Sequence, residues 1–191
     1  MSYSNIFDEK IICKKYDINL LLCKSKNSNE LNKYRLNLEV HNNSINIDTF
    51  INNNLFELLC KLNKDIIDEY KIINNGNNIN VFILFKRFGQ ELGIKQKYSY
   101  FESSISKNNK SFVIKTKVLK CPTSLIKNDC ESLDYTSSFI NIKLLTTHSC
   151  RIDYIFDTFK TDIDLPIYME NLFGLLTKKL FYRLKIFIEK L

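Results

Sequence analysis

Four aspartates near the end of the chain form a cluster of carboxylates that could do chemistry. Asp153 and Asp157 fall on one face of a predicted strand, and Asp162 and Asp164 follow within a few residues. Grouped carboxylates hold Mg²⁺ at phosphoryl-transfer sites. A plainer interpretation is that Asp164 caps a helix and that Arg151 pairs with Asp153 one strand step away. A Mg²⁺-dependent enzyme that uses this Asp cluster therefore stays only a second alternative.

Cysteine and histidine residues offer another candidate site. Cys121, Cys130, His148 and Cys150 are close in the sequence, but none has the C-x₂-C spacing of a common zinc site. The chain has two histidines, and no nucleophile motif lies near His41 or His148 to work with a histidine base. We therefore predict no catalytic residue, no metal and no cofactor. Enzymatic activity is uncertain, and the sequence leans against it.

A third candidate is a stretch in which basic and aromatic residues are interleaved. Aromatic side chains among cations on an open sheet hold single-stranded nucleic acids, and the chain carries a formal net charge of +7 at pH 7. The plainer interpretation is a solvated surface, because nearly all the cations are Lys whereas sites that read bases favour Arg. The predicted polyanion-binding residues are Arg87, Lys95, Lys97, Phe101, Lys115 and Lys117.

The composition explains part of this charge. The sequence has no alanine and is rich in Asn, Ile, Lys and Leu, which indicates an AT-rich genome such as that of a protist or a large DNA virus. Its six cysteines follow no secretory signal, so we predict free thiols in a reducing, intracellular compartment, cytoplasmic or nuclear. No apolar run is long enough to predict a transmembrane segment.

The elements that must position these residues are mostly strands. Residues 33–41 alternate most clearly, with Tyr34, Leu36, Leu38 and Val40 on one face. Residues 10–23 predict one or two edge strands. A hairpin is expected around Asn75-Gly76, and residues 95–102, 112–119, 138–147 and 151–159 complete the set of predicted strands.

Two helices are predicted. A shorter one covers residues 54–67, where Asn54 and Glu57 form an approximate capping box. A long one covers 164–191, with Pro166 in its first turn. Its apolar residues recur at steps of three and four, and they are Leu165, Met169, Leu172, Phe173, Leu176, Leu180, Leu184, Phe187, Ile188 and Leu191.

These elements predict a single α+β domain over residues 1–191, with a loose N-terminus at 1–8 and an inserted loop at 121–133. A twisted antiparallel sheet of about six or seven strands would pack on the long C-terminal helix, which is a helix-grip-like arrangement. In the order of its elements the chain resembles the Bet v 1 and START-like families, and the resemblance implies the helix-grip fold.

Our main functional prediction is a non-enzymatic intracellular binding protein that uses a Lys-rich sheet face to bind a polyanion, such as nucleic acid, or an acidic protein partner. The alternative is a carrier that holds an apolar small molecule between the sheet and the C-terminal helix. The carrier hypothesis predicts an empty pocket of a few hundred Å³ in that place.

Overall fold

The computed structural model describes residues 10–15, 20–26, 32–51, 54–76, 78–88, 90–127, 129–133, 135–158 and 167–191. The strands are β1 (Lys10–Lys15), β2 (Leu20–Lys26), β3 (Asn32–His41), β4 (Ile67–Asn75), β5 (Asn78–Phe85), β6 (Gln96–Asn108), β7 (Ser111–Val118), β8 (Cys130–Ser132), β9 (Tyr135–Thr146) and β10 (Ser149–Thr158). The helices are α1 (Leu55–Leu62) and α2 (Ile167–Glu189), with short 3₁₀ turns η2 (Ile47–Phe50), η3 (Gln90–Leu92) and η4 (Thr123–Leu125).

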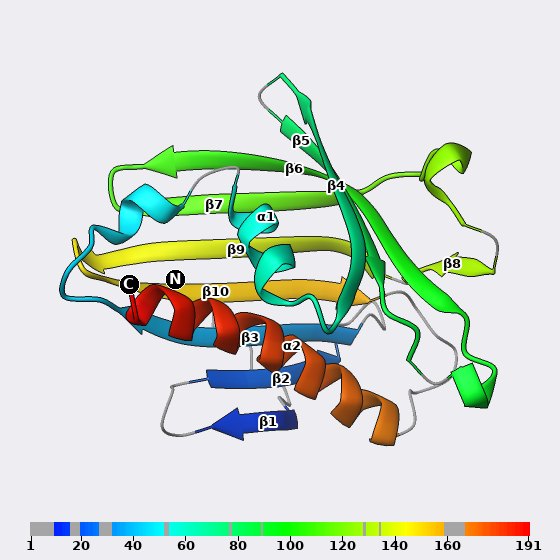
Figure 1. Cartoon of the computed structure of the whole chain (residues 1–191). Coiled ribbons are helices and arrows are strands. Elements are labelled where there is room, and N and C mark those ends of the chain that lie inside the picture. The colour runs from blue at the N-terminus through cyan, green and yellow to red at the C-terminus, as the bar shows by residue number, and fades with distance from the viewer. Residues whose placement is uncertain are drawn as a thin grey trace.

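The described strands form one twisted sheet. Its order is β1-β2-β3-β10-β9-β7-β6-β5-β4, with antiparallel neighbours throughout, and β8 pairs parallel with β6 (Figure 1). Seven of these strands, β3 to β7, β9 and β10, are the seven predicted after residue 32. β1 and β2 are the predicted edge strands of the N-terminal segment, and β8 lies in the predicted insert. The predicted α+β architecture is therefore confirmed.

The alternation of apolar and polar residues along β3 places its apolar side chains on the inner face of the sheet. Tyr34, Leu36, Leu38 and Val40 are almost completely buried, as predicted. Each lies opposite an inner residue of β10, so the two strands bury a common apolar surface. The β4–β5 hairpin turns at Gly76, whose φ of +61° is a backbone conformation that glycine adopts without steric cost.

Both helices cover the inner face of the sheet (Figure 1). The face of α2 that packs inward consists of the residues Gly174, Thr177, Phe181, Leu184 and Ile188. The predicted stripe is correct for Leu184 and Ile188, but Leu172 and Leu191 are 43% and 51% exposed. The prediction was imprecise because α2 has two neighbours. Leu176 and Leu180 are only half-buried, and they pack against a smaller cluster that includes Cys60 of α1 and Ile67 of β4.

Helix α1 is shorter than predicted, because β4 already begins at Ile67. Asn54 makes no side-chain capping bond, so the predicted capping box does not form. At the other end of α1, Asn63 is the C-terminal cap, and its Nδ2 donates to the carbonyl oxygen of Leu59 over 2.9 Å. The N-terminus at 1–8, Asp164 and Pro166 lie outside the described residues.

The segment 121–133, predicted as a loop, contains η4 and β8 and covers the outer face of β5 and β6. Its Cys121 is buried against Phe82, Leu84 and Tyr100, which makes a second, smaller core on the side of the sheet away from the helices. Across the described ranges, neither helix is long and apolar enough to cross a bilayer.

Candidate functional site

The predicted polyanion-binding residues do not converge on one surface. Arg87 lies after β5, where its Nε donates to Gln96 Oε1 over 3.4 Å. Lys95 is exposed in the turn before β6, and Lys97 pairs with Glu131 at 2.7 Å. The Glu131 carboxylate therefore partly neutralises this end of the predicted site.

Phe101 is separated from the two remaining cations by the sheet itself. It is buried on the inner face, where its ring meets Phe56 edge-on with centroids 5.4 Å apart. Lys115 and Lys117 are exposed on the outer face, and Glu102 lies directly opposite Lys117. Phe101 therefore cannot stack a base beside these lysines, and binding of a polyanion stays a prediction.

The candidate metal sites are also dispersed. Asp153 is held by Arg35, with Arg35 Nη2 3.5 Å from Asp153 Oδ1, and by the amide of Asn37. Arg151, the partner expected for Asp153, instead binds Glu39 with Nη2 2.6 Å from Oε1. The side chain of Asp157 and the whole of Asp162 and Asp164 lie outside the described residues. Within the described ranges, no three His, Cys, Asp or Glu side chains are close enough to hold a metal.

The candidate cysteine and histidine group is divided by the sheet as well. Cys121 and Cys130 lie in the outer core, and Cys150 lies in the inner one. His148 occupies the β9–β10 turn, where its Nδ1 is 2.8 Å from the carbonyl oxygen of Ile45. His41 is at the end of β3, with Nε2 2.7 Å from Asn43 Oδ1. No zinc site can form from these positions.

One enclosed space lies between the helices and the middle of the sheet. Its volume is about 20 Å³, and every side chain that lines it is apolar. The lining comes from η2, α1, β9, β10 and α2, and consists of Ile47, Ile51, Leu55, Leu59, Ile140, Ile142, Cys150, Ile152, Phe181, Leu184 and Ile188.

This space is far smaller than the carrier hypothesis required. A volume of about 20 Å³ accommodates about one water molecule, whereas an alkyl chain needs a few hundred Å³. The expectation of a preformed pocket of a few hundred Å³ there is therefore wrong for the described part of the chain. The side chains of Phe181, Leu184 and Ile188 project from α2 into the interior and fill it. Room for a ligand in this space requires that one of the elements that line it moves.

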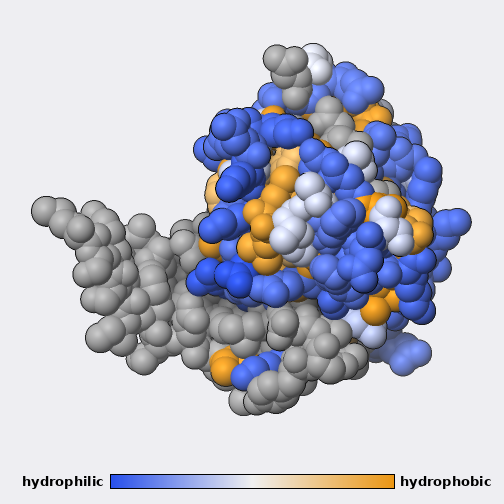
Figure 2. Space-filling model, turned by 90° about the vertical axis from the view of Figure 1, so that its left-hand side faces the viewer, coloured by the Kyte–Doolittle hydropathy of each residue, from blue (hydrophilic) through white to orange (hydrophobic). Residues whose placement is uncertain are grey.

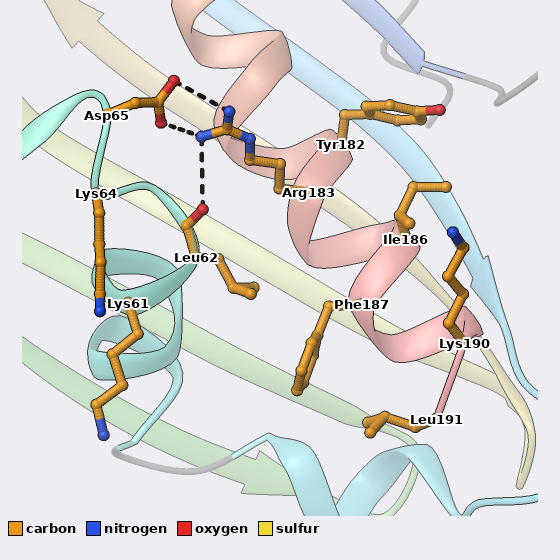
Figure 3. Close-up of a pocket in the computed structure, with 10 residues that line it drawn as sticks. All are labelled: Lys61, Leu62, Lys64, Asp65, Tyr182, Arg183, Ile186, Phe187, Lys190 and Leu191. Carbon is orange, nitrogen blue, oxygen red and sulfur yellow. Dashed lines mark hydrogen bonds and ion pairs between the residues drawn. The ribbon is translucent and has the colours of Figure 1, made fainter.

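An ion-pair cluster closes the seam between α1 and α2. Asp65, in the turn after α1, binds Arg183 of α2, with Asp65 Oδ2 3.0 Å from Arg183 Nη2 (Figure 3). Asp65 Oδ2 also lies 2.5 Å from Nζ of Lys179, on the same helix. Arg183 also donates to the carbonyl oxygen of Leu62 over 3.5 Å and to Asn63 Oδ1 over 3.3 Å. Arg183, followed by Lys179, lowers the pKa of Asp65 well below its usual range. The cluster therefore holds the two helices together while Asp65 is ionised.

Beside this cluster, the seam forms an open groove of about 880 Å³ on the solvent side of the helices. Leu62 and Phe187 point into it, while Lys61 and Lys64 project away from α2 (Figure 3). Viewed from the side on which α2 ends, the surface shows apolar side chains in a hollow framed by hydrophilic ones (Figure 2). The seam is thus apolar in its middle and charged at its edges.

The C-terminal end of α2 is fastened separately to β3. Asn42 Nδ2 donates to the carbonyl oxygen of Ile188 over 2.5 Å, and Lys185 Nζ donates to the carbonyl oxygen of Glu39 over 2.8 Å. The backbone N–H of His41 donates to Glu189 Oε1 over 3.1 Å. These bonds fix the C-terminal end of the helix to the sheet, so a movement of α2 that displaces Leu184 and Ile188 must break them.

The sequence analysis did not identify Asp65 or Arg183 as functional candidates. One signal was available, because Arg183 is one of only four arginines in a Lys-rich chain, and Arg is the residue suited to bidentate pairing with a carboxylate. Its partner could not be found from the sequence, since Asp65 is 118 residues away.

Comparison with known proteins gives a clear result for the fold alone. The sequence matches no protein-family model, and no curated protein is significantly similar to it. The human StarD13 (DLC2) lipid transfer and protein localization domain matches with a TM-score of 0.72 and 11% identity, over 97% of this chain and 91% of that one. Human StAR-related lipid transfer protein 5 matches with a TM-score of 0.71 and 11% identity, over 95% and 86%.

Human STARD10 is a third similar structure, with a TM-score of 0.66 and 14% identity over 92% of this chain and 72% of that chain. The similarity extends over nearly the whole chain in all three cases, so it includes the sheet and both helices that enclose the apolar interior. The chain therefore has the START-like helix-grip fold that its element order predicted.

Proposed function

We propose that this protein binds one apolar small molecule between α2 and the inner face of the sheet, and that α2 moves away from the sheet to admit it. The observation that carries the proposal is the lining of the enclosed space, which is apolar on every side. Ligand sites of this kind are mostly apolar, with few polar groups.

The fold supports the same conclusion. Two of the similar structures are a lipid transfer domain and a lipid transfer protein by name, and each matches at least 95% of this chain. Identities of 11% do not carry over any particular ligand. The shared fold does support an apolar ligand in the place where a helix-grip fold encloses its interior.

The closed interior constrains how a ligand is taken up. Leu184 and Ile188 occupy the volume that a ligand would need, so the ligand must displace part of α2. The seam at Asp65 and Arg183 is one polar attachment that such a movement must break, and the bonds that hold the C-terminal end of α2 to Glu39 and Asn42 are another. Binding therefore selects or induces an open state, and the affinity is reduced by the free energy of opening.

The proposal is tested by titrating the protein with a fluorescent apolar probe. We expect saturable binding with retention of the native circular dichroism spectrum. Truncation of Ile152 to Ala enlarges the enclosed space from the sheet side, so this variant should bind the probe more tightly than the wild type does.

The matched control is Leu145→Ala, because Leu145 is 45% exposed and does not line the enclosed space. This control should bind the probe as the wild type does. If neither the wild type nor the Ile152→Ala variant binds the probe saturably, the proposed function is wrong.

A further inference from the structure

A row of small hydroxyl side chains crosses the inner face of the sheet. Ser138 on β9 lies opposite Thr116 on β7, and Thr116 lies opposite Ser103 on β6. All three are buried, although the rows on either side of them are made of apolar residues such as Phe101 and Ile114. Hydroxyl groups in an apolar interior must be hydrogen-bonded, or their burial is costly.

Two of the three hydroxyls bind each other. Thr116 Oγ1 and Ser138 Oγ are 2.7 Å apart, and the backbone N–H of Ser138 donates to Thr116 Oγ1 over 3.0 Å. The hydroxyl of Tyr154 joins this pair through a hydrogen bond with Ser138, and burial raises the pKa of Tyr154 to about 12. This part of the row is a satisfied network.

Ser103 is different. It is 1% exposed, and its Oγ has no hydrogen-bond partner within the described part of the chain. An unsatisfied buried hydroxyl destabilises a fold, and a serine there is therefore unexpected on packing grounds alone. Ser103 faces the inner side of the sheet beside Phe101, in the part of that face that α1 covers. It lies two strands away from β9, which lines the enclosed space, so a ligand reaches the unpaired group by extending from that space beneath α1.

Charge is missing from the same interior. The buried polar side chains of the described residues are Asn42, Asn63, Gln96, Ser99, Ser103, Thr116, Ser138 and Thr177, and none of them is ionisable near neutral pH. A phosphate, carboxylate or ammonium group buried here would find no counter-charge among them, and an unpaired buried charge is strongly unfavourable.

We propose that the ligand is an uncharged amphiphile with one hydroxyl or carbonyl group, and that this group hydrogen-bonds to Ser103. The inference rests on the proposed function, because it assumes that an apolar body occupies the interior. A hydroxyl ligand can accept from or donate to Ser103 Oγ, and a carbonyl can accept from it. A site built for such a bond discriminates against ligands that lack the group.

The test compares three twelve-carbon ligands, 1-dodecanol, dodecane and dodecanoate, by displacement of the fluorescent probe. The variant is Ser103→Ala, and the matched control is Ser104→Ala, the next residue on β6, which faces the opposite side of the sheet. Ser103→Ala should weaken dodecanol about tenfold, which corresponds to one hydrogen bond. It should leave dodecane within about twofold of the wild type.

A purely structural role for Ser103 predicts a different result. Loss of a structural hydrogen bond would lower the melting temperature of the ligand-free protein, whereas loss of an unpaired hydroxyl should leave it unchanged or raise it. Dodecanoate, ionised at pH 8, should bind about a hundredfold more weakly than dodecanol, because its charge would be buried unpaired.

The outcomes separate this inference from the proposed function. If neither dodecane nor dodecanol displaces the probe, or the probe itself does not bind, the proposed function fails and the inference fails with it. If both ligands bind and Ser103→Ala weakens them equally or not at all, only the inference is overturned. Binding of dodecanoate as tight as that of dodecanol would also overturn it, since the polar group would then lie outside the interior.

Discussion

Replacing Asp65 by Asn should make α2 open more often. Among the described residues, Asp65 is the one anionic partner on the α1 side of the seam that pairs with Arg183 and Lys179, and its side chain is 45% exposed. Exposed ion pairs contribute 0.2–1 kcal/mol each. Loss of both pairs should therefore destabilise the closed state by about 1 kcal/mol, which raises the open population roughly fivefold.

Cys150 reports this opening directly. It lines the enclosed space beneath α2, it is 1% exposed, and burial raises its pKa to about 12. A thiol reagent can modify it only after the helix moves or the protein unfolds. We expect Asp65→Asn to raise the labelling rate of Cys150 about fivefold at neutral pH, as measured by mass spectrometry of the peptides.

Two controls separate opening from global unfolding. Cys121 is buried in the outer core, away from both helices, so its labelling rate should not change unless the whole domain unfolds. Glu57→Gln removes a carboxylate that pairs with Lys61 inside α1 and does not reach α2, so this variant should behave as the wild type. The reasoning is refuted if Cys150 and Cys121 accelerate together, or if Asp65→Asn labels no faster than Glu57→Gln.

The pH dependence of this attachment has a definite sign. Arg183 and Lys179 lower the pKa of Asp65 in the folded protein, so its contribution is fully present above the ordinary Asp pKa of about 4. The contribution is lost as pH falls through the lower, folded-state pKa. The difference in melting temperature between the wild type and Asp65→Asn should therefore persist from pH 7 to pH 5 and shrink only below about pH 4.

Three further predictions follow from the packing and the charges. Phe181→Ala should cost about 3–5 kcal/mol of unfolding free energy in a urea titration, while Leu175→Ala, at 55% exposed, should cost less than about 0.5. A thiol reagent should count six free cysteines in unfolded protein prepared with alkylation protection, and recovery of a disulfide would contradict the predicted reducing compartment. Replacing Lys115 and Lys117 by Gln should flatten the salt dependence of single-strand binding by about 1.4 in log–log slope, and a wild type that does not bind in a filter assay would contradict the polyanion prediction.

Local patterns in the sequence were sufficient for most of the fold. The alternation from Tyr34 to Val40 and the Asn75-Gly76 turn are determined by neighbours in the chain, so strands and hairpins could be predicted from them. The orientation of α2 about its own axis could not be predicted, because its apolar residues pack into two different clusters. Phe181 packs into the main core and Leu176 packs into the smaller cluster around Cys60, and nothing in the local period distinguishes these two surfaces.

The candidate site was harder to predict for a related reason. Ser103, Thr116 and Ser138 become a row only through the β6–β7 and β7–β9 registers, and each alone is an ordinary strand residue. Phe101 was assigned to a basic surface because the aromatic and basic residues are adjacent in the sequence. Strand alternation places its ring on the inner face, opposite to Lys115.

The energetics of opening set a minimum size for the ligand. Burying Phe181, Leu184 and Ile188 contributes about 1.5–3 kcal/mol each, so exposing all three costs roughly 5–9 kcal/mol. A ligand gains about 0.8 kcal/mol for each buried CH₂, so about 6–11 methylenes are needed to offset that cost before any net affinity appears. Hexane or hexanol should therefore fail to displace the fluorescent probe at concentrations where the twelve-carbon ligands succeed. Equal displacement by six-carbon ligands would show that binding does not require α2 to move away from the sheet. The binding site would then be the open groove at Leu62 and Phe187.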